Sequence, residues 1–297
     1  MAALTTGSLT IPKQLLEPWV NNIHKGSTIS QLSGSIPMKF GAGEAFVFDS
    51  GEAEYVGEGA NKSSNDVTKT TQTVEPFKFQ KTIRFTNEVQ WADEDHQLGV
   101  IQEILNQIQP ALSRALDYGV IHGINPKTGA VVSAMQRLTS ATTSVELAAA
   151  DAPYVSTDAA IAALLAVDGV PNGIAMDPKF AAKISGQRLP TGQKLYPDFT
   201  FSNESSNFES LRAATSKTVG ATGVLAVDTK LRAVVGDFSA IRWGVQRAIG
   251  LELIEFGDPD GNGDLKRNNQ VAFRAEVVYG WGIAEINRNF AKIVDLV

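Results

Sequence analysis

Residues 98–123, LGVIQEILNQIQPALSRALDYGVIHG, predict the longest helix of this 297-residue chain. Three acidic residues at 93–95 favour its N-terminal end, and Gly123 is placed to terminate it. Pro110 interrupts the hydrogen-bond ladder, so we expect a kink or two abutting helices there. The helix would be about 35–40 Å long at ~1.5 Å per residue. Its apolar residues recur at spacings of three and four and predict one buried face: Leu98, Ile101, Leu105, Ile108, Leu112, Leu116 and Val120.

Residues 271–283, VAFRAEVVYGWGI, predict an unusually long strand. Apolar side chains occupy every odd position, which is the period of a strand with one face in a core. Gly280 and Gly282 favour bending or bulging. At about 3.3 Å per residue the strand would exceed ~40 Å. A long helix beside a long strand predicts an elongated domain.

The residues before the helix predict an arm followed by a long hairpin. Residues 1–40 form an extended arm, and its short apolar stripe, which includes Trp19, must dock on its own domain or on a neighbouring subunit. Strand candidates at 46–48, 54–56 and 77–85 surround the polar run 59–66, so we expect a hairpin within 41–88. An isolated hairpin is at best marginally stable in water. We therefore expect support from another chain, with a mobile surface loop as the alternative.

Residues 154–245 predict a mixed α/β unit. Residues 156–158 can cap a helix that ends near Gly169, and Asp177 with Pro178 opens a second helix that Gly186 closes. The segments 224–227 and 233–235 predict short buried strands, whereas 187–217 resembles a surface loop. Residues 249–256 add a strand, and the predicted fold class is α+β.

The composition excludes several classes of function. The chain has no cysteine, which excludes disulfides, Cys-ligated zinc, iron–sulfur clusters and thiol catalysis. A net charge of −6 argues against a dedicated nucleic-acid binder. No stretch approaches the roughly 20 apolar residues of a membrane span, and no catalytic or phosphate-binding motif is present. We expect no enzymatic activity, no cofactor and no bound metal.

Two features imitate functional sites. His24, His96 and His122 are far apart in sequence, and each is interpreted as a surface or helix-end histidine; the charge of His122 would suit the helix dipole. Residues 258–264, DPDGNGD, present oxygens at alternate positions with Gly263 at the sixth, as a calcium loop would. The twelfth position, however, is Asn269 instead of a bidentate Glu. A turn between strands is therefore favoured, with calcium as the alternative.

The order of arm, hairpin, long helix, α/β unit and long strand resembles the major capsid proteins of tailed bacteriophages. Their Hong Kong-97-type fold is shared with encapsulins, and the resemblance covers nearly the whole chain. It looks like an actinobacterial-phage branch of that family. The resemblance rests on PM at 37–38, GEAEYVGEG at 51–59, ALDY at 115–118, HGINP at 122–126, VGDF at 235–238 and NQVAFR at 269–274.

The resemblance implies a division of the chain into parts. These are an N-terminal arm (1–40), an extended loop (41–88), a peripheral domain with the spine helix (89–153), an axial domain (154–245) and the C-terminal strands of the peripheral domain (246–297). Because the arm begins almost at Met1, a scaffold would be a separate chain, unless the sequence begins after a cleavage site.

The resemblance also implies a function and partners. The protein would self-assemble in the host cytoplasm into hexamers and pentamers of an icosahedral virion shell. The shell would enclose double-stranded DNA without sequence-specific binding, and no membrane would be involved. Portal, scaffolding and decoration proteins are further candidate partners. An encapsulin compartment is the alternative function, and an enzyme with a dispersed site is a second one.

Seven residues are candidate subunit contacts. Three glutamates lie beside Lys62 and Lys69 in the extended loop and give it alternating charge. We expect this loop to pair with a basic patch on the neighbouring subunit, at Arg84 or Arg114. The alternative is an ordinary solvated surface, because surface charge pairs contribute little individually. The candidates are Trp19, Glu52, Glu54, Glu58, Lys62, Arg84 and Arg114.

Overall fold

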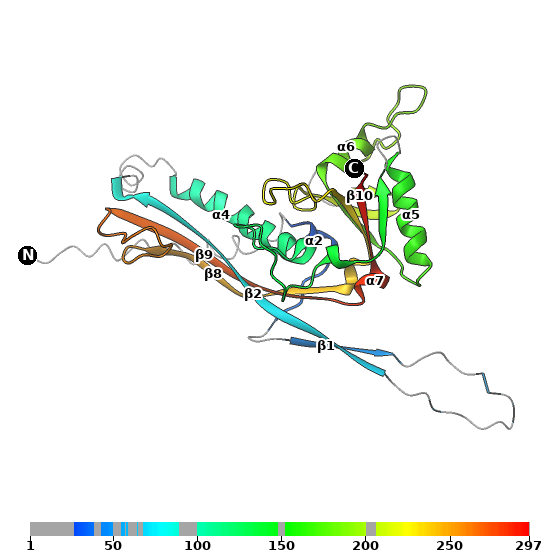
Figure 1. Cartoon of the computed structure of the whole chain (residues 1–297), viewed down its shortest axis with the longest axis horizontal. Coiled ribbons are helices and arrows are strands. Elements are labelled where there is room, and N and C mark those ends of the chain that lie inside the picture. The colour runs from blue at the N-terminus through cyan, green and yellow to red at the C-terminus, as the bar shows by residue number, and fades with distance from the viewer. Residues whose placement is uncertain are drawn as a thin grey trace, which may run out of the picture.

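The computed structural model describes residues 27–38, 43–49, 55–56, 58, 64, 68–88, 100–147, 152–199 and 206–296. Figure 1 shows an elongated α+β molecule with a two-stranded hairpin projecting from its body. A four-stranded sheet and a six-stranded sheet organise the chain. None of the helices in the described part of the chain is both long enough and apolar enough to span a bilayer.

The four-stranded sheet, called the long sheet below, is antiparallel throughout. Its order is β1 (Gly43–Asp49), β2 (Thr68–Thr86), β9 (Gln270–Ile283) and β8 (Ile241–Ile254). β9 has 14 residues and confirms the predicted long strand. β2 has 19 residues and extends beyond β9 to pair with β1, from Gly43 opposite Val74 to Asp49 opposite Thr68. This pairing confirms the predicted hairpin, but the strand candidate at 54–56 is wrong at residues 55–56, which are in no strand.

The predicted long helix is α4 (Val100–Asp117), which continues directly into a π-helix, Tyr118–His122. Pro110 lies inside α4 without ending it, so the alternative of two abutting helices is wrong. The change of helix geometry occurs after Asp117 instead. There an added Cβ on Gly119 would lie 2.5 Å from Cη2 of Trp281, so only glycine fits this close approach to β9. Gly123, with φ of 64°, terminates the π-helix as predicted.

The six-stranded sheet is mixed. Its order is β3 (Ser144–Leu147), β10 (Phe290–Asp295), β7 (Leu231–Gly236), β4 (Gly173–Met176), β6 (Leu211–Thr215) and β5 (Ser206–Phe208). The pairs β3–β10 and β4–β6 are parallel, and the others are antiparallel. β7 confirms the strand predicted at 233–235.

Each face of the six-stranded sheet belongs to a different core. Alternate residues point to opposite faces, as the period of a strand requires: Ile174 and Val235 pack with α5 (Pro153–Leu165) and α6 (Pro178–Ser185). Ala175 and Val234 instead join the core that contains the end of α4, α2 (Thr28–Leu32) and the long sheet. The smaller elements are Leu138–Ser140, Phe238–Ala240 and α7 (Ile286–Asn289).

Several local predictions in the α/β unit are wrong, although α6 has its predicted caps at Asp177 and Gly186. The other helix, α5, begins at Pro153 instead of being capped at 156–158, because proline suits a first helical turn. Residues 224–227 form a turn and a bend, with an isolated bridge from Leu225 to Thr222 instead of a strand, and Val227 is 79% exposed. Ala221 and Gly223 before it have φ of 52° and 85°, which breaks an extended strand. β5 and β6 occupy part of the segment expected to be a loop.

Candidate assembly surfaces

The hairpin formed by β1 and β2 is the most prominent projection of the molecule (Figure 1). The region that joins the two strands carries most of the predicted contact residues. Glu58 lies there in an exposed turn. Trp19, Glu52, Glu54 and Lys62 lie outside the described residues, so their proposed roles remain predictions.

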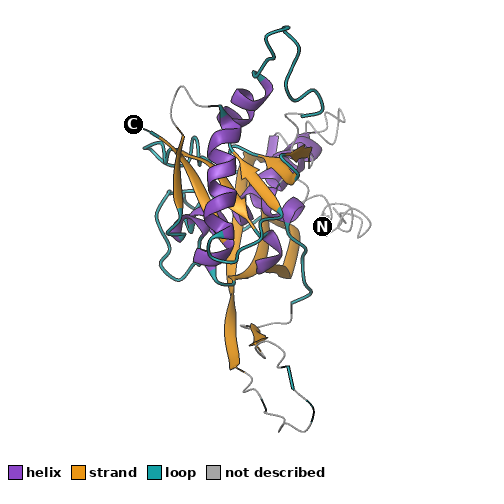
Figure 2. Cartoon of the chain, turned by 90° about the vertical axis from the view of Figure 1, so that its right-hand side faces the viewer, coloured by secondary structure: helices purple, strands orange, loops and turns teal. Residues whose placement is uncertain are grey.

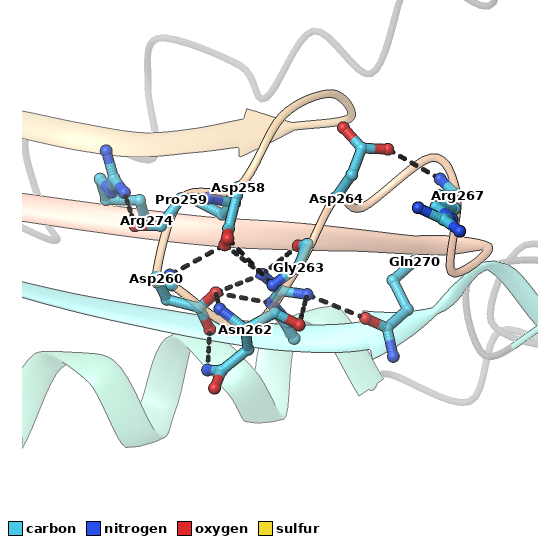
Figure 3. A network of polar contacts seen from close by, with 11 residues as sticks. Asp258, Pro259, Asp260, Asn262, Gly263, Asp264, Arg267, Gln270 and Arg274 are labelled. Atoms are coloured by element: carbon cyan, nitrogen blue, oxygen red, sulfur yellow. Dashed lines mark hydrogen bonds and ion pairs between the residues drawn. The ribbon is translucent and has the colours of Figure 1, made fainter.

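Arg84, near the end of β2, is enclosed by the turn that joins β8 to β9. Figure 3 shows that turn and the polar contacts around Asp258, Asp260 and Gly263. Its Nε donates to Oδ1 of Asp260 at 2.8 Å, and its Nη2 donates to Oδ1 of Asp258 at 2.9 Å. Nη2 also donates to the carbonyl of Gly263 at 2.8 Å, and Nη1 donates to Oε1 of Gln270 at 3.1 Å. The guanidinium of Arg84 is therefore engaged within its own chain, where it joins β2 to the β8–β9 turn and to the first residue of β9.

The acidic turn is held by this cation and by its own backbone. Hydrogen bonds from Arg84 lower the pKa of Asp260 to about 2. Backbone N–H groups, first that of Gly263 at 2.9 Å and then that of Gly261 at 2.8 Å, lower the pKa of Asp258. The interpretation as a turn between strands is confirmed. Within the described ranges, no group of three or more His, Cys, Asp or Glu side chains could hold a metal ion.

Replacing Arg84 with methionine is expected to lower the free energy of unfolding by a small amount, because two carboxylates lose their charged partner. The pKa of Asp260 should rise toward its ordinary value of about 3.9. Denaturant unfolding and NMR titration of the carboxyl carbons measure the two effects. Arg242→Met, at an exposed arginine of β8, is the matched control. An unchanged Asp260 titration in the Arg84 variant would contradict the assignment.

Arg114, the second predicted basic residue, lies half-buried near the C-terminal end of α4. Burial lowers the pKa of Lys81 on the neighbouring strand β2, and the positive charge of Arg114 lowers it further. The two side chains thus form a basic pair between helix and sheet. Among the ion pairs of the described residues, none involves Arg114.

Asp117 connects three segments that are distant in sequence. Its fully buried carboxylate accepts hydrogen bonds from the hydroxyls of Ser27 and Thr28 and from the backbone N–H groups of Thr28 and Ile29, at the start of α2. The hydroxyl of Thr218 donates to Oδ2 at 2.6 Å from the loop after β6. Asp117 therefore fixes α2, which lies within the predicted arm of residues 1–40, to α4 and to the α/β unit.

His122 closes the π-helix, but it is buried instead of lying at the surface. Its Nε2 is 3.0 Å from the carbonyl oxygen of Thr218 and 2.9 Å from that of Val219, distances at which a ring N–H donates. Burial lowers the pKa of His122 below its ordinary value. The predicted helix end is correct. The predicted interaction of a charged imidazole with the helix dipole is wrong, because burial disfavours the charged form.

The burial of His122 predicts a decrease of stability with acidification. The native state favours the neutral ring, so below about pH 6.5 it binds fewer protons than the unfolded chain. The free energy of unfolding should therefore fall as the pH falls from about 7 through 6.5 toward the lowered pKa. His122→Gln should lower stability at pH 7 and flatten this dependence. Denaturant unfolding at several pH values measures it, and equal slopes for both proteins would rule the explanation out.

Comparisons with known proteins agree with this architecture. The sequence profile described as Phage capsid family matches residues 7–288. The structure is similar to that of a protein from Mycobacterium phage Ogopogo, with 43% sequence identity and a TM-score of 0.80, covering 91% of this chain and 92% of that chain. A protein from Gordonia phage Cozz has 29% identity and a TM-score of 0.76, covering 91% of this chain and 87% of that chain.

A more distant similarity reaches beyond these phages. The capsid of a native GTA particle computed with C5 symmetry is 14% identical, with a TM-score of 0.56, and covers 92% of this chain and 91% of that chain. At this identity it shows a shared fold alone. No curated protein sequence matches the chain significantly.

Proposed function

This chain belongs to the phage capsid family, and from that premise we propose how its parts build a shell. It is a structural major capsid protein of the virion, not an enzyme, and it self-assembles into the icosahedral phage head. The observation that carries this conclusion is the family match over residues 7–288. We therefore reject the two alternatives, an encapsulin compartment and an enzyme with a dispersed site.

In the shell, we assign residues 1–40 to the arm, 41–88 to the extended loop, 89–153 and 246–297 to the peripheral domain, and 154–245 to the axial domain. The copies form hexamers and pentamers around double-stranded DNA. The projecting hairpin supports the assignment of the extended loop, because it adds contact area without enlarging the subunit's core. The core between α5, α6 and the six-stranded sheet supports the assignment of the axial domain, and β3 and β10, from the ranges 89–153 and 246–297, contribute to that core.

The acidic residues of the extended loop, Glu52, Glu54 and Glu58, pair with the basic pair Arg114 and Lys81 of the neighbouring subunit. Two observations favour this surface over Arg84. The guanidinium of Arg84 is enclosed by its own acidic turn. Arg114 lies close enough to Lys81 to lower its pKa, at the junction of α4 and β2. A carboxylate from another subunit would stabilise the charged forms of both side chains.

Charge reversal at Arg114 tests this contact. The purified native protein should form uniform icosahedral shells in negative-stain electron microscopy. Arg114→Glu should remain folded and form fewer shells, and lysines at positions 52, 54 and 58 in the same chain should restore them. Arg242→Glu, at an exposed arginine away from the basic pair, is the control. The contact is wrong if Arg114→Glu assembles normally, whereas native protein that remains monomeric contradicts the function itself.

A further inference from the structure

The outer face of α5 is apolar where a solvent-facing helix is normally polar. Tyr154, Val155 and Leu165 are 40%, 45% and 54% exposed. With two alanines they lie along one side of the helix, and the single charged residue of α5 is among them. This set is called the α5 stripe: Tyr154, Val155, Asp158, Ala159, Ala162 and Leu165.

The inner side of α5 includes two buried hydroxyl side chains. Ser156 and Thr157 are buried, and their hydroxyls donate to the carbonyl of Pro153 at 3.1 and 3.0 Å. The inner side packs on β10, β3 and β7, whereas α5 lies on the side of the molecule that faces the viewer in Figure 2. A helix without a polar outer face is typical of burial on both sides. Burial of the outer face therefore requires another surface.

The apolar surface continues past the end of α5. Val167 and Val170 are 46% and 71% exposed. Together with the α5 stripe, they form a run of exposed aliphatic and aromatic side chains within residues 154–170. Contiguous exposed apolar surface of this kind marks an interaction site.

A second exposed patch on the same unit has the complementary chemistry. Residues 187–195 form a hairpin, in which Leu189 and Gln193 as well as Leu195 and Gln187 are joined by backbone hydrogen bonds of 2.9 and 3.0 Å. Leu189 and Leu195 are 42% and 37% exposed. Arg188 and Lys194 are bridge partners and add two exposed cations on the other face of the hairpin, because alternate residues of a strand point to opposite faces. The hairpin thus offers aliphatic side chains and positive charge to a partner that offers aliphatic side chains and one carboxylate.

We propose that the α5 stripe of one copy receives the 187–195 hairpin of the next copy around a capsomer axis. A ring of copies requires two different patches on each subunit, and these two patches supply them. Ala159 and Ala162 leave space on the stripe for Leu189 and Leu195, and Asp158 meets the cations of the hairpin. The inference rests on the proposed function, because it takes the occupant to be a second copy of this chain.

The first test places a charge on the stripe. Val155→Glu should keep the native circular dichroism and melting temperature but reduce the assembled fraction by at least about tenfold, because an unpaired carboxylate would be buried at the interface. Val227→Glu is the matched control, because Val227 is 79% exposed in a turn outside both patches. Sedimentation velocity and electron microscopy measure assembly. Normal assembly of the Val155 variant overturns the proposal.

Charge reversal provides a test that does not depend on the folding of the first variant. Asp158 is exposed, so Asp158→Lys should remain folded and assemble less than the native protein. Adding Arg188→Glu and Lys194→Glu to the same chain should restore assembly. If assembly is not restored in the triple variant, the pairing is wrong. Failure of the native protein and of the Val227 variant to assemble would instead contradict the proposed function.

The absence of cysteine allows a direct test of proximity. With Ala159→Cys and Leu189→Cys in one chain, a short bismaleimide should give a ladder of covalent oligomers on a denaturing gel. Ala159→Cys with Val227→Cys should stay monomeric. Modified chains that remain monomeric, including any linked internally, overturn the proposal.

Discussion

Replacing residues 50–67 with Asn-Gly is expected to give a folded subunit that cannot build stable shells. Asp49 and Thr68 are the last paired residues of β1 and β2, and a two-residue Asn-Gly turn joins such a pair directly. The variant therefore keeps the register of the hairpin. It loses the acidic residues that we assign to contacts with the neighbouring subunit, and each shell loses that contact at every copy.

Electron microscopy and sedimentation velocity should show capsomers or monomers instead of shells, while the melting temperature of the subunit changes by no more than a few degrees. A second variant, with residues 50–67 replaced by a Gly/Ser linker of equal length, separates side-chain contacts from loop length. If the contacts are charged, this linker should fail as the short turn does. Shells with native heat resistance from the Asn-Gly variant would show that the loop has no role in assembly. The same result from the Gly/Ser variant would show that the side chains of the loop have none.

Replacing Asp117 with asparagine is expected to reduce the free energy of unfolding by about 3–5 kcal/mol. The change is nearly isosteric, but it removes a charged acceptor and turns an NH₂ group toward donors of Ser27, Thr28 or Thr218. Buried donors that lose an acceptor keep the cost of desolvation. The loss should be greatest for residues 27–33, because Asp117 binds the N-terminal end of α2.

Denaturant unfolding measures the global effect of Asp117→Asn, and hydrogen exchange measures the local one at the amides of Thr28 and Ile29. Those amides should exchange faster by a larger factor than amides of β7. Asp198→Asn, at an exposed aspartate, is the control and should change stability by less than about 0.5 kcal/mol. A loss below about 1 kcal/mol for Asp117→Asn, with Thr28 still protected, would mean that the carboxylate does not anchor this segment.

The elements whose apolar pattern repeats over many residues were predictable from the sequence. α4 and β9 follow directly from apolar side chains that repeat over many residues, and α6 follows from Asp177, Pro178 and Gly186 at its ends. Short apolar runs carry too little information, as residues 224–227 show. The preceding residues Ala221 and Gly223 adopt positive φ angles, and only the glycine makes such an angle predictable from the sequence.

The polar contacts were mostly not predictable, because they join distant residues. Arg84 and Asp258 are 174 positions apart, and nothing in the sequence indicates that the β8–β9 turn meets the end of β2. Asp117 offered a partial signal. Asp117 directly follows Leu116, which belongs to the predicted buried stripe, and a carboxylate in such a place needs a partner inside the protein. The sequence could not show that Ser27, Thr28 and Thr218 supply the hydrogen-bond donors.

The position of β9 and β10 in their sheets also determines when a newly made chain can fold. β9 separates β2 from β8, and β10 separates β3 from β7, so both sheets have a gap until residues 270–295 have left the ribosome. Domains fold as units during synthesis, at about 5–20 residues per second. A nascent or truncated chain that lacks residues 270–295 therefore lacks both finished sheets, and its incorporation into a shell must wait until these residues have been made.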